Sequence, residues 1–89
     1  MGWRIVRQPN GLLARFSDIV DDFTDVDMTD AQALFLCTEK SGVDIADGKL
    51  ARADEFPERF DECIEAIRIV HGVDESVKRR IDLSEDRST

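Results

Sequence analysis

The chain has 89 residues, of which 42% are hydrophobic and 36% charged, and its formal net charge at neutral pH is −8. This length suits one small domain and excludes a multidomain protein. The apolar residues recur periodically along the chain, which argues against a disordered acidic polypeptide.

Membrane and secretion signals are missing from the sequence. No apolar run approaches the roughly 20 residues that a helix needs to cross a bilayer. The first residues lack the basic-then-apolar order of a signal peptide. Cys37 and Cys63 both fall in apolar segments, where a buried thiol is expected in place of a disulfide. We therefore expect a cytoplasmic protein that makes no membrane contact.

Residues 3–17 have the pattern of a β-hairpin. The segment from Trp3 to Gln8 alternates and is β-branched at its centre, as a half-buried strand is. The Asn-Gly pair at 10–11 readily adopts the positive φ values of a hairpin turn. The apolar residues expected on one side of this hairpin, covered by helices, are Trp3, Ile5, Leu12, Ala14 and Phe16.

The acidic segment from Asp18 to Asp27 is predicted to be a short helix or helical turn. Four aspartates spaced at i, i+3, i+4 and i+7 fall on one helical face: Asp18, Asp21, Asp22 and Asp25. Ser17 can cap the start of this helix. The indifferent helix propensity of Asp, Val, Ile and Thr argues against it.

Two later segments carry clear helix signals. Thr29 and Gln32 form a capping box before a helix over about 29–41, which is apolar nearly all round and therefore expected to be buried on several sides. A helix over 57–71 ends at Gly72. Its inward face is formed by Phe60, Cys63, Ile64 and Ile67.

The remaining segments are less regular. A last helix is expected to be capped by Asp74, with Val77 and Ile81 facing inward. Residues 43–55 leave two alternatives open, which are a small hairpin turning at residues 47–48 and a loop with a helical turn.

Together these segments predict an α+β fold, in which an N-terminal β-hairpin packs on about three α-helices. The predicted domain covers residues 1–83, and residues 84–89 are expected to form a frayed tail. The expected core consists of Trp3, Ile5, Phe16, Leu34, Phe35, Phe60, Ile64 and Ile67.

No residue pattern indicates catalysis or a metal site. A calcium loop counted from Asp25 needs Gly at its sixth position and Glu at its twelfth, where the chain has Asp30 and Leu36. Nucleophilic catalysis needs a base beside Ser or Cys, and His71 is the single histidine. We therefore expect no enzyme, no catalytic residue, no metal and no cofactor.

The acidic segment is the best candidate for function. A row of carboxylates resembles a row of phosphates in charge and rough spacing, so it could occupy the basic groove of a nucleic-acid-binding protein. The predicted partner-binding residues are Asp18, Asp21, Asp22, Asp25, Asp27 and Asp30. The alternative that acidity only keeps a small protein soluble stays open.

Two other functions compete with this interpretation. A small DNA- or RNA-binding regulator would use Arg4, Arg7 and Arg15 of the hairpin, although the net charge opposes nucleic-acid binding. A self-associating structural protein would pair an exposed hairpin edge with a second copy, as a homodimer.

Three stretches of the chain are distinctive: Trp3-Arg4-Ile5-Val6-Arg7-Gln8-Pro9-Asn10-Gly11, then Ala14-Arg15-Phe16-Ser17-Asp18-Ile19-Val20-Asp21-Asp22-Phe23, and Phe60-Asp61-Glu62-Cys63-Ile64-Glu65-Ala66-Ile67 with the later His71-Gly72. They resemble a family of small uncharacterised proteins carried by phages and other bacterial mobile elements. The resemblance implies no activity. It favours a mobile-element accessory protein, a class that includes anti-CRISPR inhibitors, whose partner is a host or phage protein with a basic nucleic-acid-binding surface.

Overall fold

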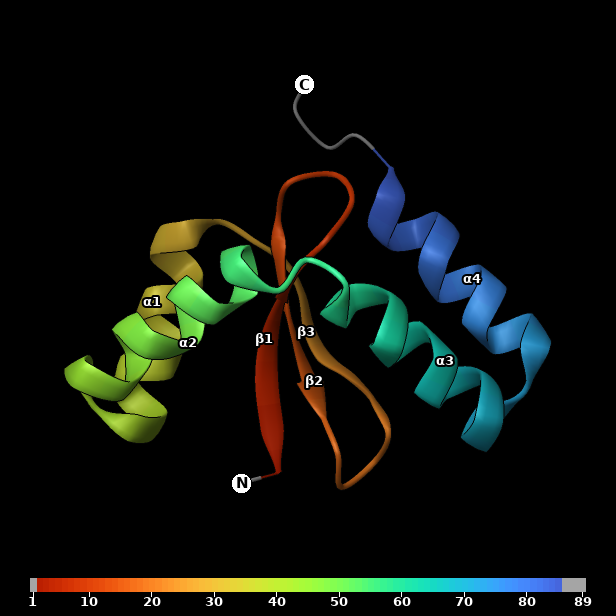
Figure 1. Cartoon of the computed structure of the whole chain (residues 1–89), viewed down its shortest axis with the longest axis horizontal. Coiled ribbons are helices and arrows are strands. Elements are labelled where there is room, and N and C mark those ends of the chain that lie inside the picture. The colour runs from red at the N-terminus through yellow and green to blue at the C-terminus, as the bar shows by residue number, and fades with distance from the viewer. Residues whose placement is uncertain (1, 86–89) are drawn as a thin grey trace.

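The computed structural model describes residues 2–85 and has the predicted α+β architecture, with a three-stranded antiparallel sheet followed by four helices (Figure 1). The elements in chain order are β1 (Trp3–Arg7), β2 (Leu13–Ser17), β3 (Asp22–Met28), α1 (Asp30–Ser41), α2 (Val43–Glu55), α3 (Arg59–His71) and α4 (Val73–Ser84). Strand β2 is central, and β1 and β3 are the two edges of the sheet.

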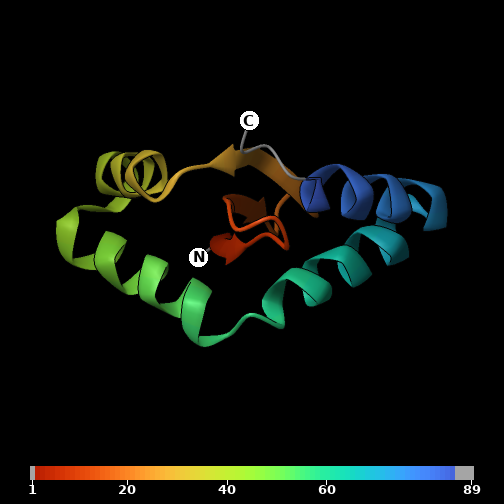
Figure 2. The same ribbon diagram turned by 90° about the horizontal axis from the view of Figure 1, so that it is seen from above.

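The helices form two pairs, one on each face of the sheet. Helices α1 and α2 lie on one side of the strands and α3 and α4 on the other (Figure 1). Seen from above, the sheet lies between the two helix pairs, and the connection from α2 to α3 passes the β1 edge (Figure 2). Gly42 and Gly72 join the helices of each pair and have φ values of 90° and 102°, which suit glycine.

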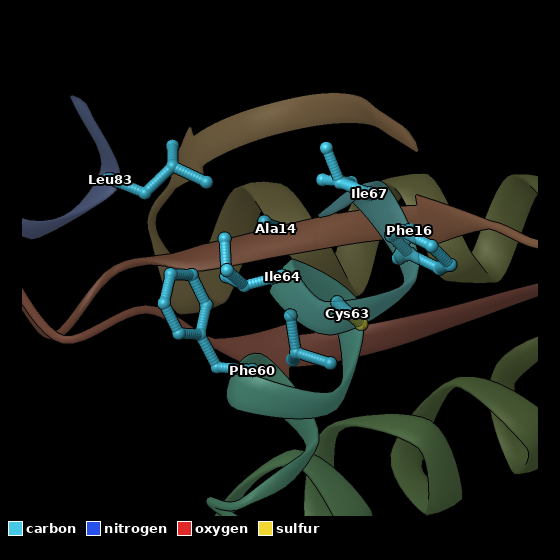
Figure 3. Close-up of a cluster of buried hydrophobic side chains, with 8 residues drawn as sticks. Ala14, Phe16, Phe60, Cys63, Ile64, Ile67 and Leu83 are labelled. Atoms are coloured by element: carbon cyan, nitrogen blue, oxygen red, sulfur yellow. The ribbon is translucent and has the colours of Figure 1, made fainter. Parts of the chain in front are cut away.

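Each face of the sheet has its own hydrophobic core. The core on the α3–α4 side is formed by Val6, Ala14, Phe16, Phe60, Cys63, Ile64, Ile67 and Leu83 (Figure 3). The core on the α1–α2 side is formed by Ile5, Leu13, Met28, Ala33, Cys37, Ala46 and Ala53. Neighbouring residues on a strand point to opposite faces, so Ile5 and Val6 are both fully buried.

The predicted single apolar side of the hairpin is wrong. Ile5 pairs with Arg15 and Val6 with Ala14, so Ile5 faces α1–α2 while Ala14 and Phe16 face α3–α4. The prediction grouped residues of β1 that face α1–α2 with residues of β2 that face α3–α4. A shift of one residue exchanges the faces of a strand, and this sheet buries both of its faces.

The predicted acidic helix is also wrong, because residues 22–28 form strand β3. Asp18 and Asp21 lie in the turn before the strand, where Asp21 has a φ of 51°. The ring of Phe23 packs 5.5 Å from that of Phe16 and 6.0 Å from that of Phe60, centroid to centroid. These aromatic contacts outweigh a helix pattern made mostly of aspartates, which are indifferent helix formers.

The helices differ from expectation in which sides they bury. Residues 43–55, left open by the sequence, form α2, whose Ala46 and Ala53 are fully buried. Leu34 and Phe35 were expected in the core but are 39% and 67% exposed, because α1 turns only one side to the sheet.

Helix α4 also buries a different side from the predicted one. It buries Ser76 and Leu83, whereas the predicted inward residues Val77 and Ile81 face solvent. It begins at Val73 with no side-chain cap, so the predicted cap at Asp74 is wrong. Of the predicted tail, Ser84 ends α4, Glu85 follows it, and residues 86–89 lie outside the described residues.

Candidate functional site

The two edges of the sheet differ in how they are covered. Near β1, Lys49 of α2 donates a hydrogen bond to the backbone carbonyl of Trp3 at 3.2 Å, and Arg7 binds Asp54 of α2 at 2.8 Å. Within residues 2–85, β2 is the single strand that pairs with β3, so the outer side of β3 has no strand neighbour. Two register shifts along β3 distort this edge, a feature that discourages edge-to-edge aggregation.

A groove of about 390 Å³ lies beside this open edge, between β3 and α4. Its lining consists of Asp22, Phe23, Val26, Asp27, Arg79, Asp82 and Leu83. Three of these side chains are carboxylates, three are apolar and one is an arginine. The groove therefore combines an apolar floor with an excess of negative charge, a combination that suits the aliphatic stem and cationic head of a basic side chain.

An ion pair between Asp22 and Arg79 ties β3 to α4 inside the groove. The guanidinium of Arg79 donates to both carboxylate oxygens of Asp22, at 3.0 and 2.8 Å, and also to Glu75 at 2.9 Å. These bonds lower the pKa of Asp22 and raise the pKa of Arg79. Both groups stay charged at neutral pH, and the fork of two bonds fixes the spacing of the groove walls.

A buried glutamine contacts two of the residues that line the groove, Asp27 and Leu83. Gln8 is 1% exposed, and its Nε2 donates to Oδ1 of Asp27 at 2.8 Å. Its Oε1 accepts from the backbone N–H of Asp27 at 2.7 Å, and Nε2 also approaches the carbonyl oxygen of Leu83 at 3.3 Å. Asn10 donates to the carbonyl oxygen of Glu85 at 2.8 Å. The turn after β1 thus holds β3 and the end of α4 together.

No protein-family model matches this chain, and no match is found among curated proteins or among solved structures. The resemblance to proteins of phages and other mobile elements therefore stays a prediction.

The structure brings three of the six predicted aspartates to the β3 edge and separates the others. Asp22 and Asp27 line the groove, and Asp25 lies between them on β3. Asp18 follows β2 directly and pairs with Arg4 of β1 at 3.0 Å. Asp30, at the start of α1, pairs with Arg7 at 2.8 Å, which lowers the pKa of its carboxyl. The six carboxylates therefore do not form one continuous row.

The predicted basic hairpin surface is largely neutralised by these same aspartates. Arg4 pairs with Asp18, and Arg7 pairs with acids from both α1 and α2. Arg15 lies 3.3 Å from Asp25, and its guanidinium lies over the ring of Trp3, 5.4 Å from the centroid. The exposed fractions of the three arginine side chains are 36%, 24% and 19%. They hold the fold together and leave little cationic surface for a phosphate backbone.

The other titratable groups singled out by the sequence are two buried thiols and a hydrogen-bonded histidine. Burial raises the pKa of Cys63 to about 12 and also raises that of Cys37. The Nε2 of His71 lies 3.1 Å from the carbonyl oxygen of Val20. Among residues 2–85, no three His, Cys, Asp or Glu side chains lie close enough together to hold a metal ion. None of the four described helices has the length and apolar character needed to cross a membrane.

Sequence reasoning missed the α4 side of the groove, formed by Arg79, Asp82 and Leu83. Arg79 belongs to a run of three basic residues, 78–80, that lies inside α4, since the helix continues to Ser84. The i, i+4 spacing of Glu75 and Arg79 was a usable signal, because it marks a helix side where charges are paired.

Proposed function

We propose that this protein acts by stoichiometric binding to another protein, through the open β3 edge and the groove beside it. The observation that carries the proposal is the difference between the edges of the sheet, since α2 binds β1 whereas β3 borders the groove. The groove adds an apolar surface with Val26 44% exposed at its rim. Strand edges and concave apolar grooves are the features that proteins commonly use to recognise partners.

The charge of this surface favours a cationic partner. The β3 edge and the turn before it carry Asp21, Asp22, Asp25 and Asp27, and α4 adds Asp82. Two of these are neutralised by arginines, and the chain as a whole carries −8. Electrostatic attraction would speed association with a basic surface and would slow association with nucleic acid.

Basic surfaces are a common feature of proteins that bind nucleic acid. The resemblance to mobile-element proteins supports a partner in host or phage nucleic-acid handling, with an anti-CRISPR-like inhibitor as the sharpest form of the proposal. The proposed place of action is the cytoplasm. The proposal needs no helical row of phosphate-like carboxylates, because the acids act at a strand edge and groove.

The test compares two double variants with equal charge changes. Val26→Lys with Asp82→Asn puts a cation into the groove and removes a carboxylate from its wall. Val43→Lys with Asp47→Asn makes the same replacements at exposed positions of α2, away from β3. Tagged wild-type and variant proteins are used to capture partners from a lysate of the host cells, and bound proteins are eluted with rising salt and identified by mass spectrometry.

We expect the wild type and the α2 variant to retain the same nucleic-acid-handling protein, released as salt rises, and the groove variant to lose it. Circular dichroism would establish that both variants fold. Equal retention by both variants would exclude the groove as the binding surface. Equal loss from both would mean that net charge alone governs binding.

A further inference from the structure

The turn between β1 and β2 contains the single asparagine of the chain, Asn10, followed directly by Gly11. The backbone N–H of Gly11 donates to the carbonyl oxygen of Gln8 at 3.0 Å, which closes a β-turn with Pro9 and Asn10 at its centre. Gly11 is exposed and has a φ of 91°, a value that suits glycine. The main-chain nitrogen after Asn10 therefore lies at the surface, in a residue with no side chain to shield it.

The side chain of Asn10 joins this turn to β3 and to the end of α4. Its Nδ2 donates to the carbonyl oxygen of Glu85 at 2.8 Å and lies 3.4 Å from Oδ1 of Asp27. Its Oδ1 accepts from the backbone N–H of Leu12 at 3.1 Å and from Nε2 of Gln8 at 3.0 Å. The amide oxygen thus stabilises the turn itself, whereas the amide nitrogen connects the turn to the rest of the fold.

We propose that Asn10 is a site of spontaneous deamidation, and that the product releases the end of α4 from the β1–β2 turn. In this reaction the main-chain nitrogen of Gly11 attacks Cγ of Asn10. The bond from Cγ to Nδ2 breaks, and Nδ2 leaves as ammonia with the proton of the Gly11 N–H. Water then opens the resulting succinimide ring, so that water is consumed and ammonia is released.

Neither product can make the contacts of the Asn10 amide nitrogen. Hydrolysis of the ring gives aspartate, or isoaspartate, in which the main chain runs through Cγ and is longer by one carbon. Both products carry a carboxylate, which accepts hydrogen bonds and donates none. In the aspartate an oxygen replaces Nδ2 and faces the carbonyl oxygen of Glu85 and the carboxylate of Asp27. In the isoaspartate the longer main chain also displaces Gly11 from its hydrogen bond with Gln8.

The folded turn slows this reaction and then makes it irreversible. The Gly11 N–H is held by Gln8, and the Asn10 amide is held by its own hydrogen bonds, so attack requires the turn to open. After the reaction the carboxylate prevents the original contacts from forming again. The inference is independent of the proposed function, because the reaction and its effect are both measured without a partner.

The first test is incubation of the full chain at mildly alkaline pH, in buffer and in urea, followed by mass spectrometry of the intact chain and of its peptides. The readout is the mass gain that accompanies replacement of an amide by a carboxylate. We expect the modification at Asn10, with a rate at least about tenfold higher in urea than in the native chain. An Asn10 that stays intact in urea, or equal rates in the two conditions, would overturn the proposal.

The second test measures what deamidation does to the fold. The aged chain carries an additional negative charge, so anion exchange separates it from the fresh chain for hydrogen exchange. Amides at the end of α4 and around Asp27 should exchange faster in the aged chain, while those of α1 and α2 should be unchanged. An aged chain that exchanges like the fresh one at the end of α4 would contradict the proposed release.

A matched pair of variants separates this effect from the added charge. Asn10→Asp reproduces one product and should lower the urea midpoint by about 1 M. Gln32→Glu makes the same amide-to-acid replacement at an exposed position of α1. It should leave the midpoint unchanged, because the oxygen of Gln32 accepts the hydrogen bond from the N–H of Thr29, and a carboxylate accepts it equally well. Equal midpoints for the two variants would overturn the proposal.

Discussion

Replacement of Gln8 by leucine tests the account of how the groove is held together. The leucine has nearly the same volume but removes the donors and the acceptor that join β1, β3 and α4. The backbone N–H of Asp27 loses an acceptor at 2.7 Å, and the carboxylate of Asp27 loses a donor at 2.8 Å. Because Gln8 is 1% exposed, water cannot easily replace these bonds.

The magnitude follows from the two groups of Asp27 that lose a hydrogen bond to Gln8. Each group that loses its hydrogen bond costs about 1–3 kcal/mol, so Gln8→Leu should lower the free energy of unfolding by about 2–6 kcal/mol. A chain of 89 residues has a total stability of roughly 4–13 kcal/mol. The variant should therefore be strongly destabilised, with its amide hydrogens in β3 exchanging faster than in the wild type.

Urea unfolding followed by circular dichroism measures this loss. For a small domain with a slope of about 1 kcal/mol per molar urea, the midpoint should fall by about 2 M or more. Gln32→Leu is the control, because Gln32 is an exposed glutamine that accepts from the N–H of Thr29 in the capping box of α1. Gln32→Leu should lower the free energy of unfolding by no more than about 1 kcal/mol. A Gln8→Leu midpoint within about 0.5 M of the wild type would refute the reasoning.

Three further predictions follow from burial and charge. The pKa of Asp22 is lowered by the bonds from Arg79, so the contribution of this ion pair to stability is complete above about pH 4 and is lost as pH falls below that value. Asp22→Asn should therefore flatten this part of an acid-unfolding curve. The Cys63 thiol, whose pKa is raised to about 12 by burial, should resist iodoacetamide at pH 8 in the native protein and react in urea, and rapid native labelling would contradict its burial. Ile67→Ala should lower the free energy of unfolding by about 2–5 kcal/mol, whereas Phe35→Ala should lower it by less than about 1 kcal/mol; equal losses in urea unfolding would contradict the orientation of α1.

The parts of the fold that the sequence predicted are those with local signals. The capping box of Thr29 and Gln32 is formed, with both of its hydrogen bonds present. The inward face of α3 matches the predicted residues, from Phe60 to Ile67, and Gly72 ends the helix. In each case the residues that determine the element lie within a few positions of one another, so the sequence pattern alone predicts it.

The parts that the sequence missed depend on contacts between distant segments. Strand β3 follows from the pairing of residues 22–28 with β2, while its aspartates happened to match a helical spacing. The predicted acidic face failed because Asp22 and Asp25 bind arginines that lie 57 and 10 residues away along the chain. Burial of both faces of the hairpin was hidden for the same reason, since each helix pair covers a different face.

The sheet between the two helix pairs also has a consequence for how this chain tolerates change. The two cores touch different sides of the same three strands, with no side chain shared between them. Substitutions in one core should therefore combine additively with those in the other, as they do at well-separated sites. Native-state hydrogen exchange should resolve two separately opening halves, each made of one helix pair. Mutations can thus accumulate in the α1–α2 half while the groove between β3 and α4 keeps its shape.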